Sequence, residues 1–512
     1  MKIVYMIFMF LCLTIAQPQE TIEWPSLADS PWPTFRGDAQ ATGRSQYVGP
    51  KTPNLIWEAD LPLGILWGPT IGYNEKLYFG THAFLLSDTS ESNLVYSYNS
   101  DGTINWSFET GDWINNETKP IAAHNGTVYF TTGLGELLAM TQSGDLKWRT
   151  PVMSIFYISI SKDGEVYGSI GDTLVAYNYL GEQILQKDIG EVIVSPVTFS
   201  TDGESLFFHT GAMYKPNSTN YIYSTDKEGN LNWRMGFSNS NYGEIAIDNS
   251  DNLYFYASIP GSPSPQYLYS LNKSGSINWK FQVYVYNSYS APTILFNGDI
   301  VFFTRLIDRN LIISLNQNGE TNWEYELDPD EDVFFADINH PLVSDAEGNI
   351  YLGSTDGNNF YALDREGNLL WKYDLEGREF DSSPAIGSDG TLYLGLNGSS
   401  FDRSQTRTLI AIKDDPNSVR DEETPTEFAL YQNYPNPFNP STRIKYQVAN
   451  TAKVNLIVYD ILGREIATLV NEIKPVGTHE VEFDASELPS GIFFYRLQSG
   501  DFTQTKKMMV IK

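Results

Sequence analysis

Most of the chain alternates short apolar stretches with turn residues, a pattern that predicts β-strands joined by tight turns. One stretch is an apolar and aromatic run, as in residues 76–81 (KLYFGT) and 391–396 (TLYLGL). A second run follows it, as in residues 93–99 (NLVYSYN), and then comes a phrase in which glycine precedes tryptophan by four positions. A shorter strand rich in small residues, as in residues 383–387 (SPAIG), completes each unit. Four strands in a unit of about 45 residues are typical of one blade of a β-propeller.

The tryptophan phrase marks the repeat, and one copy has leucine in its place. The positions are Trp57, Trp106, Trp148, Leu185, Trp233, Trp279, Trp323 and Trp371. The other three strands occur in eight copies, but only seven of these outer strands follow them, and the unmatched one surrounds Trp57. We therefore expect residues 54–60 to complete the last blade, whose other strands come from residues 382–413. This exchange would close an all-β, eight-bladed propeller of four-stranded blades over residues 54–413 and remove an open sheet edge.

The recurring tryptophan predicts a docking contact between neighbouring blades rather than a catalytic site. An indole at the same place in every blade can cover the gap to the next blade and bury on the order of 200 Å². Leu185 is smaller, so we expect its blade to be held most loosely.

The N-terminal residues predict an export signal. A charged start and an apolar run over residues 3–15 precede the small residue Ala16, so residues 1–16 are interpreted as a signal peptide. Residues 17–53 then form an entry segment to the propeller. Cys12 lies inside the apolar run, but a leucine precedes it where a lipoprotein signal needs a small residue, so a lipid anchor is the less favoured alternative. No later stretch is long and apolar enough for a membrane helix, and we expect no membrane span after signal cleavage.

Composition narrows the choice of partners and chemistry. The net charge is −30, from 63 acidic against 33 basic residues, and no basic stripe reverses it locally. Such a surface repels phosphate backbones, so nucleic acid is not an expected partner. Cys12 is the only cysteine, so the mature chain would have neither disulfides nor thiol chemistry.

These phrases resemble the pyrroloquinoline-quinone-type repeat propellers over residues 32–413, including the entry phrase PWPTFRGDAQATG at residues 31–43. The family holds both quinoprotein dehydrogenases and non-catalytic scaffolds similar to the outer-membrane assembly lipoprotein. The resemblance implies, for the dehydrogenases, a quinone and Ca²⁺ over the central funnel and an adjacent Cys-Cys disulfide. This chain lacks that cysteine pair and the long blade insertions that could cover a cofactor, so the scaffold branch is favoured and no cofactor is predicted.

The pattern changes after the propeller. Residues 414–427 are charged and contain two prolines, as expected of a solvated linker. Alternating strands then follow at residues 453–461, 463–470, 478–486 and 490–500, and they predict a small β-sandwich over residues 428–512.

This segment resembles the type A C-terminal sorting domain of the type IX secretion system of Bacteroidota and their relatives. The residues that carry the resemblance are Asn433, Tyr434, Pro435, Asn436, Pro437, Phe438, Asn439, Pro440, Gly463, Arg464, Gly491, Lys506 and Lys507. The resemblance implies passage through the periplasm, recognition of the domain by the outer-membrane machinery, and release or attachment at the cell surface.

One acidic loop contains a candidate metal site. Asp328, Asp330 and Asp332 alternate as the first ligands of a Ca²⁺ loop do, yet Val333 stands where such a loop needs glycine. A solvated loop is therefore the favoured interpretation, and Ca²⁺ binding is the alternative.

The loops that enter the blades are rich in aromatic residues, which could form a binding face for a sugar or a peptide around the channel. The candidates are Trp113, Tyr157, Tyr242, Tyr286, Tyr289, Phe334, Phe335 and Phe380. The alternative is that most of them belong to the cores of the blades.

Two main functions follow. The favoured hypothesis is a secreted or cell-surface binding or scaffold propeller, exported by type IX secretion, whose loop-rich face recognises a protein or a glycan. The alternative is a catalytic propeller, either a quinone-dependent oxidoreductase or a glycan-active enzyme, although no catalytic residue is identified. A structural role in the cell envelope is a third hypothesis.

Overall fold

The computed structural model divides into two compact units, Met1–Asp415 and Pro416–Lys512. It describes residues 19–62, 68–81, 94–110, 119–132, 135–150, 157–211, 220–237, 243–258, 266–283, 291–306, 309–327, 341–353, 359–380, 382–397, 407–415, 428–431, 433, 438, 440–486, 488–500 and 502–510. The signal peptide expected at residues 1–16 and most of the expected linker lie outside these residues, and the predicted domain boundaries stay predictions.

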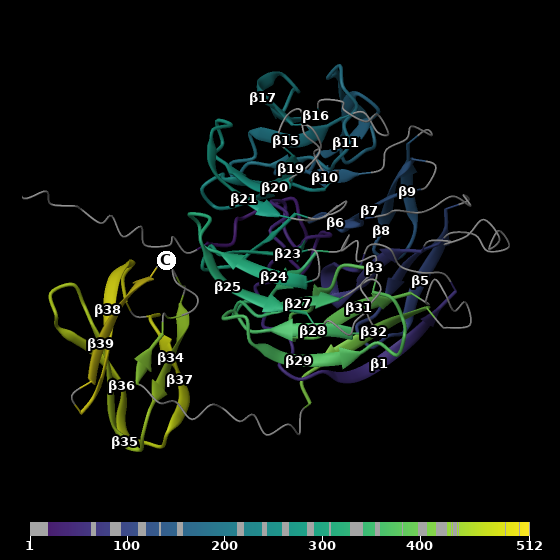
Figure 1. Ribbon diagram of the computed structural model, residues 1–512. Helices are drawn as coiled ribbons and strands as arrows, with labels where there is room; N and C mark the ends of the chain where they lie inside the picture. Colours follow the sequence, from purple (N-terminus) through teal and green to yellow (C-terminus); the bar gives the residue numbers. More distant parts are fainter. Residues whose placement is uncertain are drawn as a thin grey trace, which may run out of the picture. The chain divides into compact units, whose positions relative to one another are not determined.

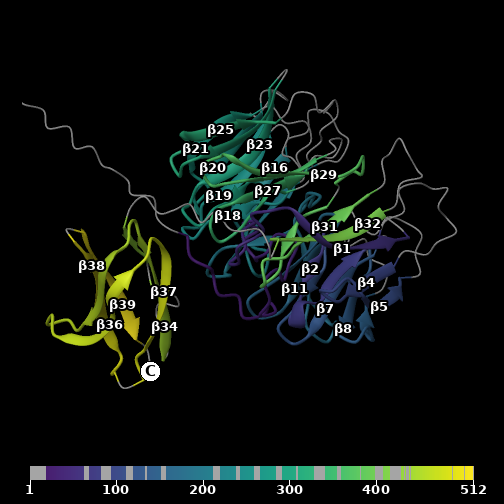
Figure 2. The same ribbon diagram turned by 90° about the horizontal axis from the view of Figure 1, so that it is seen from below.

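The first unit is an all-β propeller, which confirms the predicted fold class (Figure 1 and Figure 2). Its described residues contain eight four-stranded antiparallel sheets, the number expected from the strand count. We number these blades in chain order.

The first four blades each use four consecutive strands. Blade 1 contains β2 (Thr70–Ile71), β3 (Leu77–Gly80), β4 (Leu94–Tyr98) and β5 (Ile104–Glu109). Blade 2 contains β6 (Ile121–Ala122), β7 (Thr127–Thr131), β8 (Leu137–Thr141) and β9 (Leu146–Arg149). Blade 3 contains β10 (Ile158–Ile160), β11 (Val166–Ile170), β12 (Thr173–Tyr177) and β13 (Gln183–Asp188). Blade 4 contains β14 (Thr198–Phe199), β15 (Ser205–Thr210), β16 (Asn220–Asp226) and β17 (Leu231–Phe237).

The next three blades follow the same order. Blade 5 contains β18 (Ala246–Ile247), β19 (Leu253–Ser258), β20 (Gln266–Leu271) and β21 (Ile277–Val283). Blade 6 contains β22 (Thr293–Ile294), β23 (Ile300–Leu306), β24 (Arg309–Leu315) and β25 (Thr321–Glu326). Blade 7 contains β26 (Val343–Ser344), β27 (Ile350–Gly353), β28 (Asn359–Leu363) and β29 (Leu369–Asp374).

Blade 8 joins the two ends of the propeller. Its strands β30 (Ala385–Ile386), β31 (Leu392–Leu396) and β32 (Arg407–Lys413) are completed by β1 (Asn54–Leu61) from the other end of the chain. β1 pairs antiparallel with β32, and Trp57 lies opposite Ala411. This is the strand exchange expected from the unmatched outer strand, and it leaves no open sheet edge between the ends.

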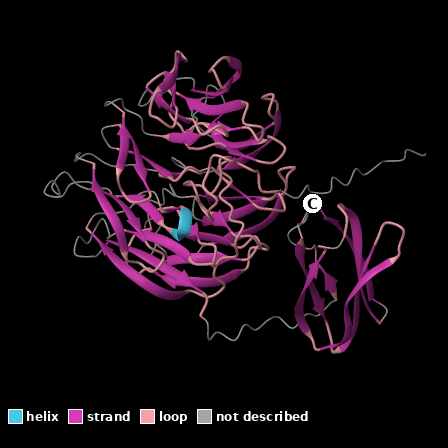
Figure 3. Ribbon diagram, turned by 180° about the vertical axis from the view of Figure 1, so that it is seen from behind, coloured by secondary structure: helices cyan, strands magenta, loops and turns pink. Residues whose placement is uncertain are grey.

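The burial of the strands follows their place in the blade. All positions of β3 and β7 are buried, because these strands pack on both faces against neighbouring blades. β5 instead alternates half-buried with exposed positions, because it lies at the outer edge. One short 3₁₀ helix, Tyr73–Glu75, is the only helical element in the described residues (Figure 3). No helix among those residues has the length and apolar character needed to cross a bilayer.

The second unit is a β-sandwich, as predicted. One sheet contains β33 (Ala429–Leu430), β34 (Ser441–Val448) and β37 (Gly477–Asp484). The other contains β36 (Glu465–Lys474), β35 (Ala452–Tyr459), β38 (Gly491–Ser499) and β39 (Phe502–Val510), in that spatial order. Ile444, Leu456 and Tyr495 are fully buried in the core between them.

Candidate functional site

The repeated tryptophans link each blade to the next. Each indole Nε1 donates a hydrogen bond of 2.8–3.1 Å to a backbone carbonyl of the following blade, or to the segment that leads into β1. The pairs are Trp57 with Ser100, Trp106 with Gln142, Trp148 with Tyr179, Trp233 with Lys273, Trp279 with Gln317, Trp323 with Arg365, and Trp371 with Pro50. These bonds account for seven of the eight joints in the ring.

The glycine of the repeated phrase completes the same joint. A Cβ atom on Gly144 would lie 2.7 Å from the Trp106 ring of the preceding blade, and φ at Gly144 is +88°. Both the close approach and the left-handed backbone require glycine. The spacing therefore has a physical reason, since the glycine receives the indole of the preceding blade and the tryptophan four positions later contacts the following one.

The joint between blades 3 and 4 is different. Leu185 lies opposite Ala176, at the register position where Trp148 lies opposite Ala139 in blade 2. Gly229 of blade 4 faces the side chain of Lys187 instead of an indole, with its ideal Cβ position 2.7 Å from Lys187 Cγ. Lys187 Nζ also donates to Asn230 Oδ1 across the joint at 3.2 Å. Lys187 therefore takes the place that Leu185 was predicted to fill against the glycine.

The entry segment occupies the middle of the ring, where Figure 1 draws it in purple. Its backbone carbonyls accept hydrogen bonds from the innermost strands of five blades: Trp32 from Ile71, Pro33 from Ala122, Gln40 from Ile247, Thr42 from Ile294 and Gly43 from Ser344. Trp24 adds blades 3 and 4, since its Nε1 donates to Ile160 O at 2.9 Å and its ring lies 5.5 Å from that of Phe199. The segment thus ties the innermost strands together around the axis.

Arg36 anchors this segment at the axis. Its guanidinium donates to the carbonyls of Ala41, Ala291 and Pro292 at 2.8–3.1 Å, and the side chain is almost completely buried. Burial lowers the pKa of Arg36, while the nearby carboxylate of Glu244 opposes that shift. Within the described residues, Arg36 therefore holds backbone rather than a surface ligand.

A buried ion pair contacts the entry segment near the axis. Lys119 Nζ is 2.5 Å from Glu244 Oε1, and the two side chains are only 8% and 5% exposed. Lys119 also lies over the rings of Phe35 at 4.2 Å and Tyr157 at 5.3 Å. A cavity of about 50 Å³ adjoins this pair, with walls from the entry segment and from the inner parts of blades 2 to 5. We call it the axial pocket.

The predicted binding-face residues divide into three groups. Tyr157 lies beside the ion pair, and its place on a binding face stays a prediction. Phe380 is fully buried and packs edge-on against Phe360 with 5.1 Å between ring centroids, so its assignment to an exposed binding face was wrong. Its ring is needed in the core of blade 7, against Gly353. Trp113, Tyr242, Tyr286, Tyr289, Phe334 and Phe335 lie outside the described residues, as do the candidate metal ligands Asp328, Asp330 and Asp332.

Sequence reasoning missed Lys119 and Glu244. They are 125 residues apart, and neither belongs to a repeated phrase. The available signal was position, because each lies two residues before the innermost strand of its blade. In the residues that the structure describes, no three His, Cys, Asp or Glu side chains gather as a metal site would need.

The sorting-motif residues that are described hold the sandwich together. Asn433 is buried, its backbone N–H donates to Tyr495 Oη at 2.7 Å, and its side chain donates to Thr442 Oγ1. Phe438 is buried, and its N–H donates to Met509 O at 3.0 Å. Pro440 O accepts the N–H of Ala485 at 2.9 Å. Tyr434, Pro435, Asn436, Pro437 and Asn439 lie outside the described residues.

The other motif residues lie in the larger sheet of the sandwich. Arg464 Nε donates to Asp460 Oδ2 at 2.6 Å and, with Gly463 at φ +77°, fixes the turn between β35 and β36. Gly491 pairs with Val510, while Lys506 and Lys507 pair with Tyr495 and Phe494 of β38.

Two family models match parts of the chain. Residues 432–512 match the secretion system C-terminal sorting domain, and residues 218–437 match the outer membrane protein assembly factor BamB. A search of curated proteins finds no match.

Similar solved structures are distant in sequence. BamB from Moraxella catarrhalis is 14% identical, with a TM-score of 0.49, over 71% of this chain and 100% of that protein. PorZ, described as an essential surface component of the type IX secretion system of Porphyromonas gingivalis, is 11% identical with a TM-score of 0.38, over 91% of this chain and 60% of that protein. From the family matches and the blade architecture, the chain combines a pyrroloquinoline-quinone-type repeat propeller, similar to BamB, with a type IX secretion sorting domain at its C-terminal end.

Proposed function

We propose that this protein is a binding or scaffold propeller that acts at the cell surface or outside the cell, with the C-terminal sandwich as its export signal. The match of residues 432–512 to a secretion sorting domain carries the proposal. Such a domain implies handling by the type IX machinery and export to the surface or beyond it. The ring that it accompanies is a closed cargo, because indole hydrogen bonds link seven of its joints and the entry segment bonds to the innermost strands around the axis.

The face of the propeller that recognises a partner is the one from which the chain enters each innermost strand. The entry segment bonds to the innermost strands and to the turns that follow them, as in the bond from His124 N to Ser26 O. The opposite end of the axis holds Tyr157, Lys119 and Glu244, which immediately precede those strands. Polar groups gathered in a concave, largely apolar setting are typical of binding sites.

Export is tested in a bacterium that has type IX secretion machinery. The full chain and a chain lacking residues 428–512 are expressed with an epitope tag, and each is measured in the periplasm, on intact cells and in the medium. We expect the full chain on cells or in the medium and the shortened chain in the periplasm. A strain without the machinery serves as the matched control and should retain the full chain. Equal export of both chains would overturn the proposal.

A further inference from the structure

The carboxylate of Glu244 has one oxygen without a hydrogen-bond partner among the described residues. Lys119 contacts Oε1, whereas Oε2 is buried and unpaired. A buried acceptor left without a partner costs free energy, and a charged acceptor costs more than a neutral one. Such a group in a native fold calls for a donor supplied from elsewhere.

The side chain of Glu244 lies at the wall of a cavity. Glu244, Lys119 and Tyr157 come one or two residues before the innermost strands of blades 5, 2 and 3. These strands run in the same direction around the axis, so their first residues meet at one end of it. Glu244 and Lys119 both line the axial pocket, which has room for a few heavy atoms.

The charges around the pocket favour a neutral donor. Two cations, Arg36 and Lys119, balance two anions, Asp38 and Glu244, and all four line the pocket. A further buried ammonium or carboxylate would have no counter-ion here and would carry a large desolvation cost. The net charge of −30 also disfavours anionic ligands at long range. A hydroxyl group can donate to Oε2 without either penalty.

The walls favour a ligand with C–H surface next to its hydroxyl groups. Ile158, Val197 and Phe199 supply apolar walls, and the half-buried ring of Tyr157 lies beside Lys119. A sugar ring has both properties, since its C–H face packs on an aromatic ring while its hydroxyl groups make hydrogen bonds.

We propose that the axial pocket binds a neutral saccharide, with a hydroxyl or hydroxymethyl group inserted to donate to Glu244 Oε2 and the sugar ring held against Tyr157. Lys119 is a positioning residue, because its ion pair holds Glu244 through Oε1 and leaves Oε2 of this pocket-lining residue without a partner. This inference rests on the proposed binding role and names the ligand class for it.

The test measures binding of methyl glycosides of glucose, galactose, mannose and N-acetylglucosamine to the purified full chain by isothermal titration calorimetry. We expect at least one to bind, and Glu244→Gln to weaken it about ten- to hundred-fold, because the acceptor is lost. Tyr157→Leu leaves the ion pair intact and should weaken the same sugar at least about ten-fold. The Tyr157→Leu variant therefore tests the site even if Glu244→Gln fails to fold.

Glu136→Gln is the matched control. Glu136 is also a buried glutamate paired with a cation, 3.6 Å from Arg149 Nη2, but it does not line the axial pocket. Binding unchanged in this variant supports the assignment. No binding of any of the four glycosides, equal loss in all three variants, or preferential binding of n-butylammonium would overturn it. Export is measured separately, so failure of sugar binding would leave the proposed export intact.

Discussion

Blade 4 is held by two joints, of which one has the repeated tryptophan and the other has leucine at that position. Toward blade 5, Trp233 donates to Lys273 O at 2.9 Å and packs against Phe207 of its own blade at 6.2 Å. Toward blade 3, the equivalent residue is Leu185, and Lys187 covers the glycine of the joint. The comparison separates the contribution of an indole to the stability of a joint from the contribution of the other groups there.

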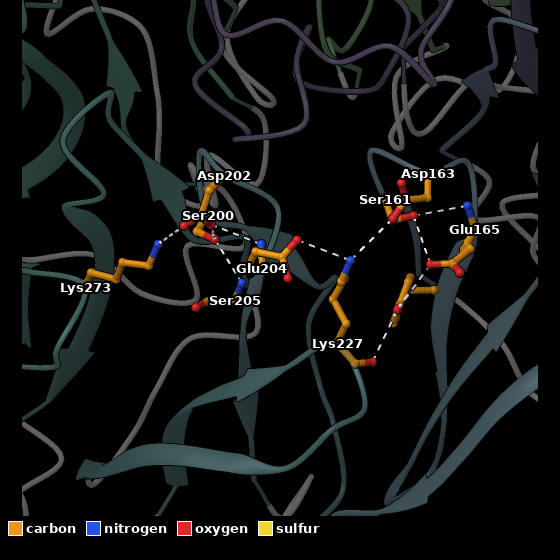
Figure 4. Close-up of polar contacts among 10 residues, drawn as sticks. Ser161, Asp163, Glu165, Ser200, Asp202, Glu204, Ser205, Lys227 and Lys273 are labelled. Carbon is orange, nitrogen blue, oxygen red and sulfur yellow. Dashed lines mark hydrogen bonds and ion pairs between the residues drawn. The ribbon is translucent and has the colours of Figure 1, made fainter.

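The rest of the joint is similar on both sides. Lys227 joins Asp163 of blade 3 to Glu204 of blade 4, with N–O distances of 3.3 and 3.2 Å (Figure 4). On the other side, Lys273 lies 2.7 Å from Asp202 of blade 4 and 3.0 Å from Asp251 of blade 5. The indole is therefore the main difference, and ion pairs alone do not explain why the ring stays closed between blades 3 and 4.

Support for the leucine joint comes from the axis. Trp24 of the entry segment bonds to Ile160 of blade 3 and packs on Phe199 of blade 4. An indole thus spans this joint after all, but from the inner end and from a distant part of the sequence. The expectation that blade 3 is the most loosely held stays a prediction, and it now applies to the outer end of the blade.

Removing the indole beside blade 4 should have the largest effect. Trp233→Ala is expected to destabilise the propeller by about 3–5 kcal/mol, because it leaves a cavity at the joint. Leu185→Ala should cost only about 1 kcal/mol, because Leu185 is half-buried and does not cover Gly229. Thermal unfolding of both variants measures the difference, and equal losses would contradict it.

Acid should destabilise the propeller through His209, which lies where blades 4 and 5 meet. His209 is fully buried beside Phe255 of blade 5, and burial lowers its pKa from 6.5 to about 3. The folded state therefore binds fewer protons than the unfolded state between these values, so stability is lost as pH falls below 6.5. By pH 5 the loss is about 2 kcal/mol.

His209→Leu removes this titration and isolates its contribution. The variant should lose less stability than the wild type between pH 7 and pH 5, as measured by denaturant unfolding at each pH. His124→Gln is the control, since His124 is exposed. A pH dependence that is the same in all three proteins would show that His209 does not titrate as described.

Introducing an indole at position 185 should strengthen the joint between blades 3 and 4. Leu185 already lies opposite Ala176, and the seven tryptophans also lie opposite alanine or serine, so the space for an indole is retained. Leu185→Trp should displace Lys187 from Gly229 and raise stability by about 1–2 kcal/mol. A lower melting temperature than wild type would mean that the Lys187 contact is the better one.

The lysine ion pairs should have the smallest effect. Lys227→Met is expected to cost less than about 1 kcal/mol, because the partner carboxylates are largely exposed. High salt should reduce that cost further. Thermal unfolding at low and high NaCl checks this, and a salt-independent loss would instead indicate lost packing of the lysine stem.

The repeated parts of the molecule could be predicted because repetition makes a weak signal count many times. The Gly and Trp spacing predicted the joints, and the unmatched Trp57 strand predicted the exchange with β32. Nothing repeats in the entry segment, so its sequence did not predict which blades Trp24 and Arg36 contact. Phe380 was misplaced because a buried core ring and an exposed binding ring look alike in sequence.

The axial pocket could not be predicted from the sequence for a related reason. Tyr157 was recognised as a loop aromatic, but Lys119 and Glu244 meet only because blades 2 and 5 share an axis. No local pattern records which innermost strands face one another. Only closure of the ring brings these residues together.

Hydrogen exchange across the outer strands tests the central claim, that indoles close the ring at seven joints and that the leucine joint depends on other groups. The full chain is exchanged at low and at high salt, and peptides from all eight outer strands are compared. We predict that β13 exchanges fastest and accelerates most in salt, while β17 and the other tryptophan strands change little. Protection of β13 equal to that of β17 under both conditions would contradict the account.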